Sequence, residues 1–158
     1  MKFTLSWLKQ HLETNSDIET ILKKLTNIGL EVESSYNPSE ALNGFIAAKI
    51  ISTKPHPDAD RLQLCLIDTG TEEIEIVCGA KNAKEGLTTI YAPVGSTIPA
   101  SGMKLKKAKI RGIESSGMLC SEKELNLGDD SEGITELSGQ ISPGTSISKA
   151  LDINDTYV

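Results

Sequence analysis

The stretch "LQLCLIDTGTEEIEIVCGA" (residues 62–80) consists of two alternating runs joined by the short segment "TGTE" (69–72). Successive side chains of a β-strand point to opposite faces, so a period of two predicts strands, here at 62–70 and 73–80. The Thr-Gly-Thr-Glu segment between them is typical of a hairpin turn. We therefore expect the fold to be built around an antiparallel β-hairpin.

The same period continues on both sides of this hairpin. "FIAAKIIST" (45–53) and "LTTIYAP" (87–93) predict two more strands, and further strands are expected within 104–114 and around 118–120. The segment "SEKELN" (121–126) is expected to form a short helix. About five strands in roughly 80 residues fit a small closed barrel or a sandwich, and closure leaves no exposed sheet edge.

The first 33 residues follow a helical period instead. Ser16 and Glu19 have the form of a capping box, an apolar stripe over 18–28 follows, and Gly29 stands where a helix C-cap residue is expected. The next residues, "LEVES", predict a short strand at 30–33, and the turn-rich "SSYNPSEALNG" (34–44) predicts a linker. The tail "ISPGTSISKALDINDTYV" (141–158) ends in strand-like alternation, and we expect it to be cut from a longer chain.

Composition excludes several classes of protein. The chain has 158 residues with 38% hydrophobic and 24% charged residues, which is typical of a globular protein. No apolar run approaches the roughly 18 residues that a membrane span needs, so we expect no membrane partner. The three cysteines are odd in number and form no CxxC pair, which favours a reduced, cytoplasmic protein.

The sequence offers no convincing catalytic or metal site. His56 lies close to Asp58 and Asp60, but two flanking prolines make a rigid turn the better interpretation. The cysteines lie in predicted strands or beside a turn without an adjacent base, and no phosphate-binding glycine loop is present. We expect this chain to be non-catalytic and to hold no metal or cofactor of its own.

The charge distribution is uneven. The chain carries a net charge of −6, yet residues 104–111 hold five basic residues and no acid, so the rest carries −11. The five are Lys104, Lys106, Lys107, Lys109 and Arg111. Two interpretations remain open, a polyanion-binding surface and a solvated basic strand. A one-residue bulge after Lys106 would bring all five cations to one side of a barrel strand and turn Leu105, Ala108 and Ile110 inward.

Aromatic content indicates how a nucleic acid would bind. Aromatic residues make up 4% of the chain, which is few for a surface that stacks single-stranded bases. Recognition of the backbone and shape of a folded RNA fits better, with phosphates on the basic residues and near the hydroxyls of Ser115 and Ser116. Met118 fits equally well as a flexible apolar contact or as a core residue.

Four ordered blocks carry a family resemblance. They are "HPDADRLQLCLIDTG" (56–70), "IVCGAKNAKEG" (76–86), "APVGSTIP" (92–99) and "KLKKAKIRGIESSGMLCSEKEL" (104–125). Together they resemble the tRNA-binding OB domain, which occurs as a free bacterial protein and attached to several aminoacyl-tRNA synthetases. The resemblance implies a mainly β, five-stranded OB barrel over 39–150. It implies tRNA contacts by Lys104–Arg111, Ser115 and Met118, with Lys81 and Asn82 as weaker candidates.

The N-terminal part, "MKFTLSWLKQHL…NIGLEVES", resembles the start of bacterial phenylalanyl-tRNA synthetase β chains. This implies an incomplete α/β element at 1–38 and the start of a returning strand at 151–158. The implied parent enzyme is a ligase with two α and two β chains that joins phenylalanine to its tRNA using ATP and Mg²⁺ elsewhere in the complex. The alternatives are a docking module of the synthetase with little RNA contact and a stand-alone tRNA-binding protein.

Overall fold

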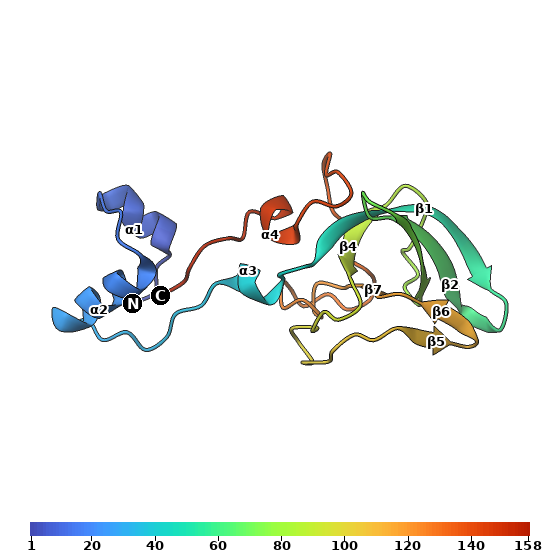
Figure 1. Cartoon of the computed structure of the whole chain (residues 1–158), viewed down its shortest axis with the longest axis horizontal. Coiled ribbons are helices and arrows are strands. Elements are labelled where there is room, and N and C mark those ends of the chain that lie inside the picture. The colour runs from blue at the N-terminus through green and yellow to red at the C-terminus, as the bar shows by residue number, and fades with distance from the viewer. The chain divides into compact units, whose positions relative to one another are not determined.

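The computed structural model describes all 158 residues. They form two compact units, which we call the N-terminal unit (1–41 with 153–158) and the barrel unit (42–152). Figure 1 shows the elements of both units.

A five-stranded antiparallel sheet forms the body of the barrel unit, with strand order β3-β2-β1-β4-β7. Its strands are β1 (Ile46–His56), β2 (Ala59–Asp68), β3 (Glu73–Cys78), β4 (Thr88–Ala92) and β7 (Met118–Leu119). The outer strands β3 and β7 contact each other, so the sheet curves back on itself. The prediction of a mainly β fold with five strands is confirmed.

Alternation in the central hairpin explains the core. On β2, Cys65 and Ile67 are fully buried, and Ile76 and Cys78 of β3 belong to the same cluster. Longer β1 adds Ile50 to this cluster, and a register shift between residues 50 and 52 marks a bulge opposite β2. A bulge increases local twist and bends a strand, which helps a small sheet to curl.

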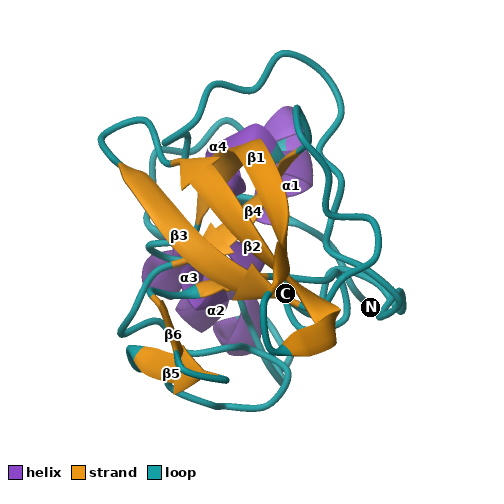
Figure 2. Ribbon diagram, turned by 90° about the vertical axis from the view of Figure 1, so that its right-hand side faces the viewer, coloured by secondary structure: helices purple, strands orange, loops and turns teal.

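The basic stretch does not form a barrel strand. Residues 105–107 are irregular, and β5 (Ala108–Ile110) pairs with β6 (Ile113–Ser115) in a separate two-stranded sheet (Figure 2). The prediction of one bulged strand over 104–111 is therefore wrong. The physical reason is a tight turn, because Arg111 and Gly112 both have positive φ, as a two-residue hairpin turn of type I′ requires.

Three short helices form the N-terminal unit, namely α1 (Leu5–His11), α2 (Ile18–Asn27) and α3 (Pro38–Ala41). The N-cap of α2 is Asp17, whose side chain accepts a hydrogen bond from the Thr20 amide, so the predicted capping box at Ser16 is wrong. Gly29 has the left-handed conformation predicted for it. The Leu30 amide bonds back to the end of α2, and no strand forms at 30–33.

One further expectation fails near the end of the chain. Residues 121–126 form turns instead of a helix, and Asn126 at their end has positive φ. The tail contains a short helix, α4 (Ile147–Ala150), whose buried Ile147 packs in the barrel unit. After it, the tail returns to the N-terminal unit, where Tyr157 bridges Thr4 and Tyr36, and Phe3 and Val158 exchange two backbone hydrogen bonds. No helix in the chain is long and apolar enough to cross a membrane.

Candidate nucleic-acid interface

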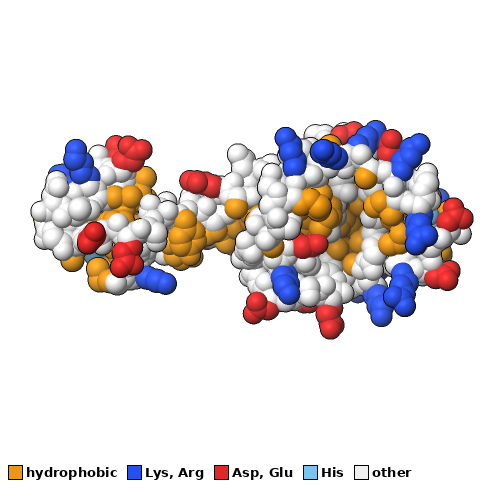
Figure 3. Space-filling view, turned by 90° about the horizontal axis from the view of Figure 1, so that it is seen from below, with side chains coloured by type: hydrophobic (Ala, Val, Ile, Leu, Met, Phe, Trp, Pro, Cys, Tyr) orange, Lys and Arg blue, Asp and Glu red, His pale blue; other side chains and the backbone are white.

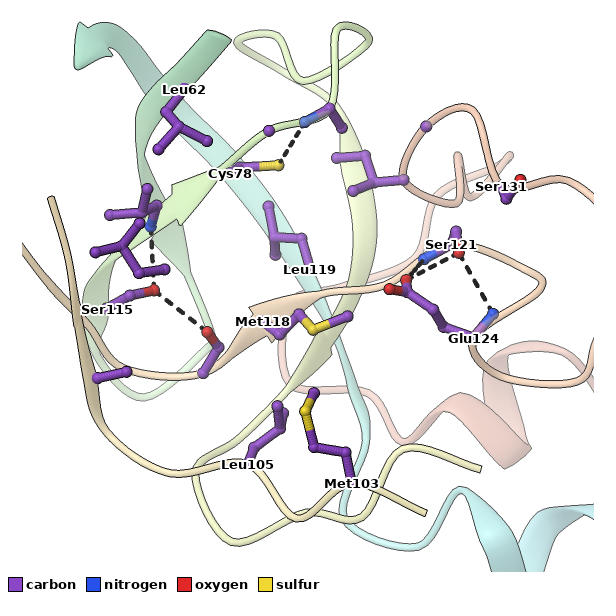
Figure 4. A pocket seen from close by; sticks show the side chains of 18 of the residues that line it. Leu62, Cys78, Met103, Leu105, Ser115, Met118, Leu119, Ser121, Glu124 and Ser131 are labelled. Atoms are coloured by element: carbon purple, nitrogen blue, oxygen red, sulfur yellow. Dashed lines mark hydrogen bonds between the residues drawn. The ribbon is translucent and has the colours of Figure 1, made fainter. Parts of the chain in front are cut away.

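A groove of about 650 Å³ opens on the barrel unit. Its lining comes from the end of β3, the segment before and within β5, the region around β7, and residues 131–134. Figure 4 shows Met118 and Leu119 near its middle, Met103 and Leu105 below them, and Glu124 to one side. Hydrophobic side chains are visible in a hollow of the surface that Lys and Arg side chains border (Figure 3). An apolar floor beside cations suits a ligand with both flat apolar and anionic parts.

The basic residues divide into two sets at this groove. Lys104 and Lys106 line it together with Ala108 and Ile110, whereas Lys107, Lys109 and Arg111 do not. The expected gathering of all five cations on one side is therefore wrong. From Lys106 into β5 the lining residues alternate, so Lys106, Ala108 and Ile110 face the groove, whereas Met103, Lys104 and Leu105 before them all line it. We call Lys104 and Lys106 the groove lysines, and Lys107, Lys109 and Arg111 the hairpin cations.

Backbone hydrogen bonds hold the segment that carries Lys104. The amide of Leu105 donates to Ser96 at 2.8 Å, and the carbonyl of Leu105 accepts from Gly95 at 2.8 Å. Lys104 itself forms a bridge with Thr97. These contacts fix the backbone at Lys104 and Leu105, between and at the groove lysines, independently of the hairpin, and both lysine side chains remain exposed.

The hairpin cations share their surface with one acid. Lys107 Nζ lies 2.7 Å from a carboxylate oxygen of Glu114, and the two side chains are 58% and 52% exposed. Glu114 is also the ladder partner of Lys109. Ion pairs exposed to this degree contribute only about 0–1 kcal/mol. Lys107 can therefore exchange Glu114 for a phosphate at little cost.

The hydroxyl of Ser115 forms hydrogen bonds inside the barrel unit. It is 3% exposed, and its hydroxyl oxygen accepts a hydrogen bond from the Val77 amide at 3.1 Å and donates to the Gly117 carbonyl at 3.3 Å. The neighbouring carbonyl of Ser116 accepts from the Tyr91 hydroxyl at 2.7 Å. These bonds tie the base of β6 to β3 and β4. Met118 is half-buried and lines the groove, so its side chain serves packing and surface together.

Gly117 explains the sharp approach of this turn to the barrel. Its φ is +116°, and a Cβ here would lie 2.5 Å from the Ala92 carbonyl oxygen and 2.6 Å from the Tyr91 ring. Only glycine lets the backbone come this close. The turn therefore brings Ser115 and Met118 to the groove together.

Lys81 and Asn82 lie outside the groove lining. The Asn82 amide donates to the Ile134 carbonyl at 2.8 Å and to Glu136 at 3.1 Å, and its oxygen accepts from the Ile134 amide at 3.0 Å. These three bonds hold the 134–136 segment against the turn after β3. Lys81 is exposed.

The aromatic residues of the barrel unit do not form a stacking surface. Phe45 and Tyr91 are both buried. The groove instead exposes the flexible side chain of Met103, a contact that alternation alone did not single out. Glu114 was also missed, and its place opposite Lys109 could have been found only after the turn at 111–112 was known.

His56 is the last residue of β1, directly before the turn to β2. It is buried, its Nδ1 accepts from the Asp58 amide at 3.0 Å, and its Nε2 lies 3.1 Å from the Ile110 carbonyl. Because Nδ1 accepts, the proton of the neutral ring is on Nε2, which donates to Ile110. No group of three potential metal-ligating side chains occurs in the structure.

Comparison with known families agrees with this geometry. Residues 45–146 match the family model described as "Putative tRNA binding domain". The chain belongs to this tRNA-binding domain family. The match covers the five-stranded sheet, the hairpin and the groove.

Curated relatives match the chain outside the barrel unit as well. It is 49% identical over 154 residues to the phenylalanine–tRNA ligase β subunit of Rhodospirillum rubrum, covering 98% of this chain and 19% of that protein. The β subunit of Paramagnetospirillum magneticum is 50% identical over 147 residues, covering 93% and 18%. The chain thus spans about a fifth of the length of these curated relatives. Among solved structures, the MetRS-related protein from Pyrococcus horikoshii has a TM-score of 0.48 and 20% identity, covering 65% of this chain and 87% of that one.

Proposed function

We propose that this tRNA-binding domain binds tRNA as a non-catalytic module of a phenylalanine–tRNA ligase, through the groove lysines and the hairpin cations. The observation that carries the proposal is the apolar groove bordered by Lys104 and Lys106, beside a hairpin with three further cations. These cations are concentrated in a chain that is otherwise strongly acidic. The positive surface is therefore local and directed, and it orients a polyanion toward this face.

The proposed contacts follow from the two cationic sets. The groove lysines and hairpin cations bind phosphates along the RNA backbone, while the groove accepts an apolar face of a sugar or an unstacked base against Met103 and Met118. Ser115 contributes by holding the base of the hairpin in place. Lys81 and Asn82, which lie outside the groove, contribute little to binding.

The relatives suggest the enzyme in which this module works. Phenylalanine–tRNA ligase β subunits match nearly the whole chain. We infer a cytoplasmic complex of two α and two β chains that uses ATP and Mg²⁺ to join phenylalanine to its tRNA. In this proposal the reacting groups are held by parts of the complex outside this chain.

Charge substitutions test the proposal against a matched control. The test variant replaces three exposed lysines of the proposed interface, and the control replaces three exposed lysines of the N-terminal unit. These are Lys104, Lys106 and Lys109→Gln, and Lys9, Lys23 and Lys24→Gln. Both variants lose the same net charge. Filter binding of an unmodified tRNA transcript should weaken at least roughly tenfold for the first variant only, with a log–log salt slope smaller by about 2–2.7. Equal weakening of both variants would refute a site at this face.

A second candidate function is a protein-docking module. Nine large hydrophobic side chains are exposed in the chain, and seven of them belong to the N-terminal unit. Examples are Trp7, Ile28 and Tyr36, with Tyr36 stacked on Tyr157. Contiguous exposed apolar surface often marks an interaction site. In the full β subunit, Trp7→Ser with Ile28→Ser should then lower assembly with the rest of the enzyme and leave tRNA binding by the barrel unit unchanged.

A further inference from the structure

The hairpin β5–β6 is only lightly attached to the barrel. Apart from its own ladder, residues 106–116 make no backbone–backbone hydrogen bond with the rest of the unit. Ser115 and Ser116 hold the base of β6 through single side-chain-to-backbone bonds. The tip, with Lys109 and Arg111, therefore needs its own attachment if it is to keep a fixed position.

His56 supplies that attachment. Its side chain is 5% exposed, and Nε2 donates to the carbonyl of Ile110, the residue directly before the Arg111–Gly112 turn. The Asp58 amide occupies Nδ1 and so fixes both the tautomer and the ring orientation. A buried group with both nitrogens bonded has little freedom, so it can hold the hairpin tip against the end of β1.

We propose that His56 is a positioning residue for tRNA binding, which holds the tip of the β5–β6 hairpin so that Lys109 and Arg111 meet RNA phosphates. His56 itself does not touch RNA. The inference rests on the proposed function and adds to it the residue that sets the position of the hairpin cations. The groove lysines do not depend on His56, because the backbone bonds of Leu105 hold their segment.

Two substitutions separate the two bonds of the ring. In His56→Asn the shorter amide can still accept from Asp58 but does not reach Ile110. In His56→Gln the longer amide can donate to Ile110. Hydrogen exchange without RNA then tests the attachment itself. Amides of 108–115 should exchange faster in His56→Asn than in His56→Gln, with the strands of the five-stranded sheet unchanged.

The RNA test uses the salt slope of tRNA binding. His56→Asn should lower its magnitude by about 1.4–1.8, the share of two phosphate contacts. The double variant Lys109→Ala/Arg111→Ala should lower the slope by the same amount. Combining this double variant with His56→Asn should lower the slope no further. Lys104→Ala/Lys106→Ala should lower the slope by the same amount in the wild-type chain and in His56→Asn. His56→Gln should restore most of the binding.

Wild-type affinity and slope in a folded His56→Asn variant would overturn the inference. The inference would also be overturned if His56→Asn removed the binding contributions of the groove lysines and of the hairpin cations equally, since general unfolding gives that result. If His56→Asn does not fold, the wild-type chain gives the test, because the Nε2 proton must be protected from solvent exchange and rapid exchange would refute the bond. If the proposed function fails, Lys109→Ala/Arg111→Ala binds like wild type while the hydrogen-exchange result still stands.

Discussion

Ser115→Ala distinguishes a residue that touches RNA from one that supports the fold. The resemblance predicted Ser115 as a tRNA contact, whereas its hydroxyl is bonded to the Val77 amide and the Gly117 carbonyl inside the barrel unit. Val77 is 9% exposed, so water cannot readily replace the lost acceptor. Leaving a buried donor unsatisfied costs about 1–3 kcal/mol. We expect the free energy of unfolding of the barrel unit to fall by that amount.

Ser116→Ala is the matched control, because only the backbone carbonyl of Ser116 has a hydrogen-bond partner within the chain. Its effect should stay within about 0.5 kcal/mol. Urea unfolding followed by far-UV circular dichroism is the appropriate assay, since the one tryptophan, Trp7, lies in the N-terminal unit. Wild-type stability of Ser115→Ala together with a loss of tRNA binding would refute this reasoning and make Ser115 a direct contact.

Two further predictions concern charges and thiols of the barrel unit. Glu114→Gln removes the carboxylate that pairs with Lys107 and should tighten tRNA binding roughly 2–5-fold at low salt, an effect that disappears at high salt because exposed charges are screened. Unchanged affinity in a titration would show that Lys107 stays away from RNA. The Cys65 thiol stabilises the thiolate of Cys78 and lowers the pKa of Cys78, whereas burial raises the pKa of Cys120 to about 12. As the pH is raised, iodoacetamide should therefore modify Cys78 at a lower pH than Cys120 by mass spectrometry, and the reverse order would contradict these environments.

The strands of the central sheet could be predicted because their cause is local. Alternating residues at 62–80 place Cys65 and Ile67 on one buried face, and the barrel forms by closing such faces. The helix N-cap was missed by one residue, because Asp17 competes with Ser16 for the same role and lies next to the first helical residue. Choosing between two adjacent capping residues depends on the entry of the chain into the helix, which composition does not specify.

The site could be predicted only in part. The five cations could be located from the sequence, but their separation into groove lysines and hairpin cations could not. This separation depends on Arg111 adopting a left-handed conformation, which is uncommon for this residue type. Once the chain turns there, Lys109 faces Glu114 and leaves the groove to Lys104 and Lys106. The role of His56 could not be predicted, because its partner Ile110 is 54 residues away in the sequence.

The salt dependence of tRNA binding to this chain tests the central claim most directly. The groove lysines and hairpin cations make five phosphate contacts, or four if Lys107 stays paired with Glu114. These contacts predict a log–log slope of magnitude roughly 3–4.5. The affinity should fall steadily as salt rises, and the slope should shrink when Lys104, Lys106 and Lys109 are neutralised. A flat salt dependence, or a slope unchanged by these substitutions, would contradict tRNA binding at this face.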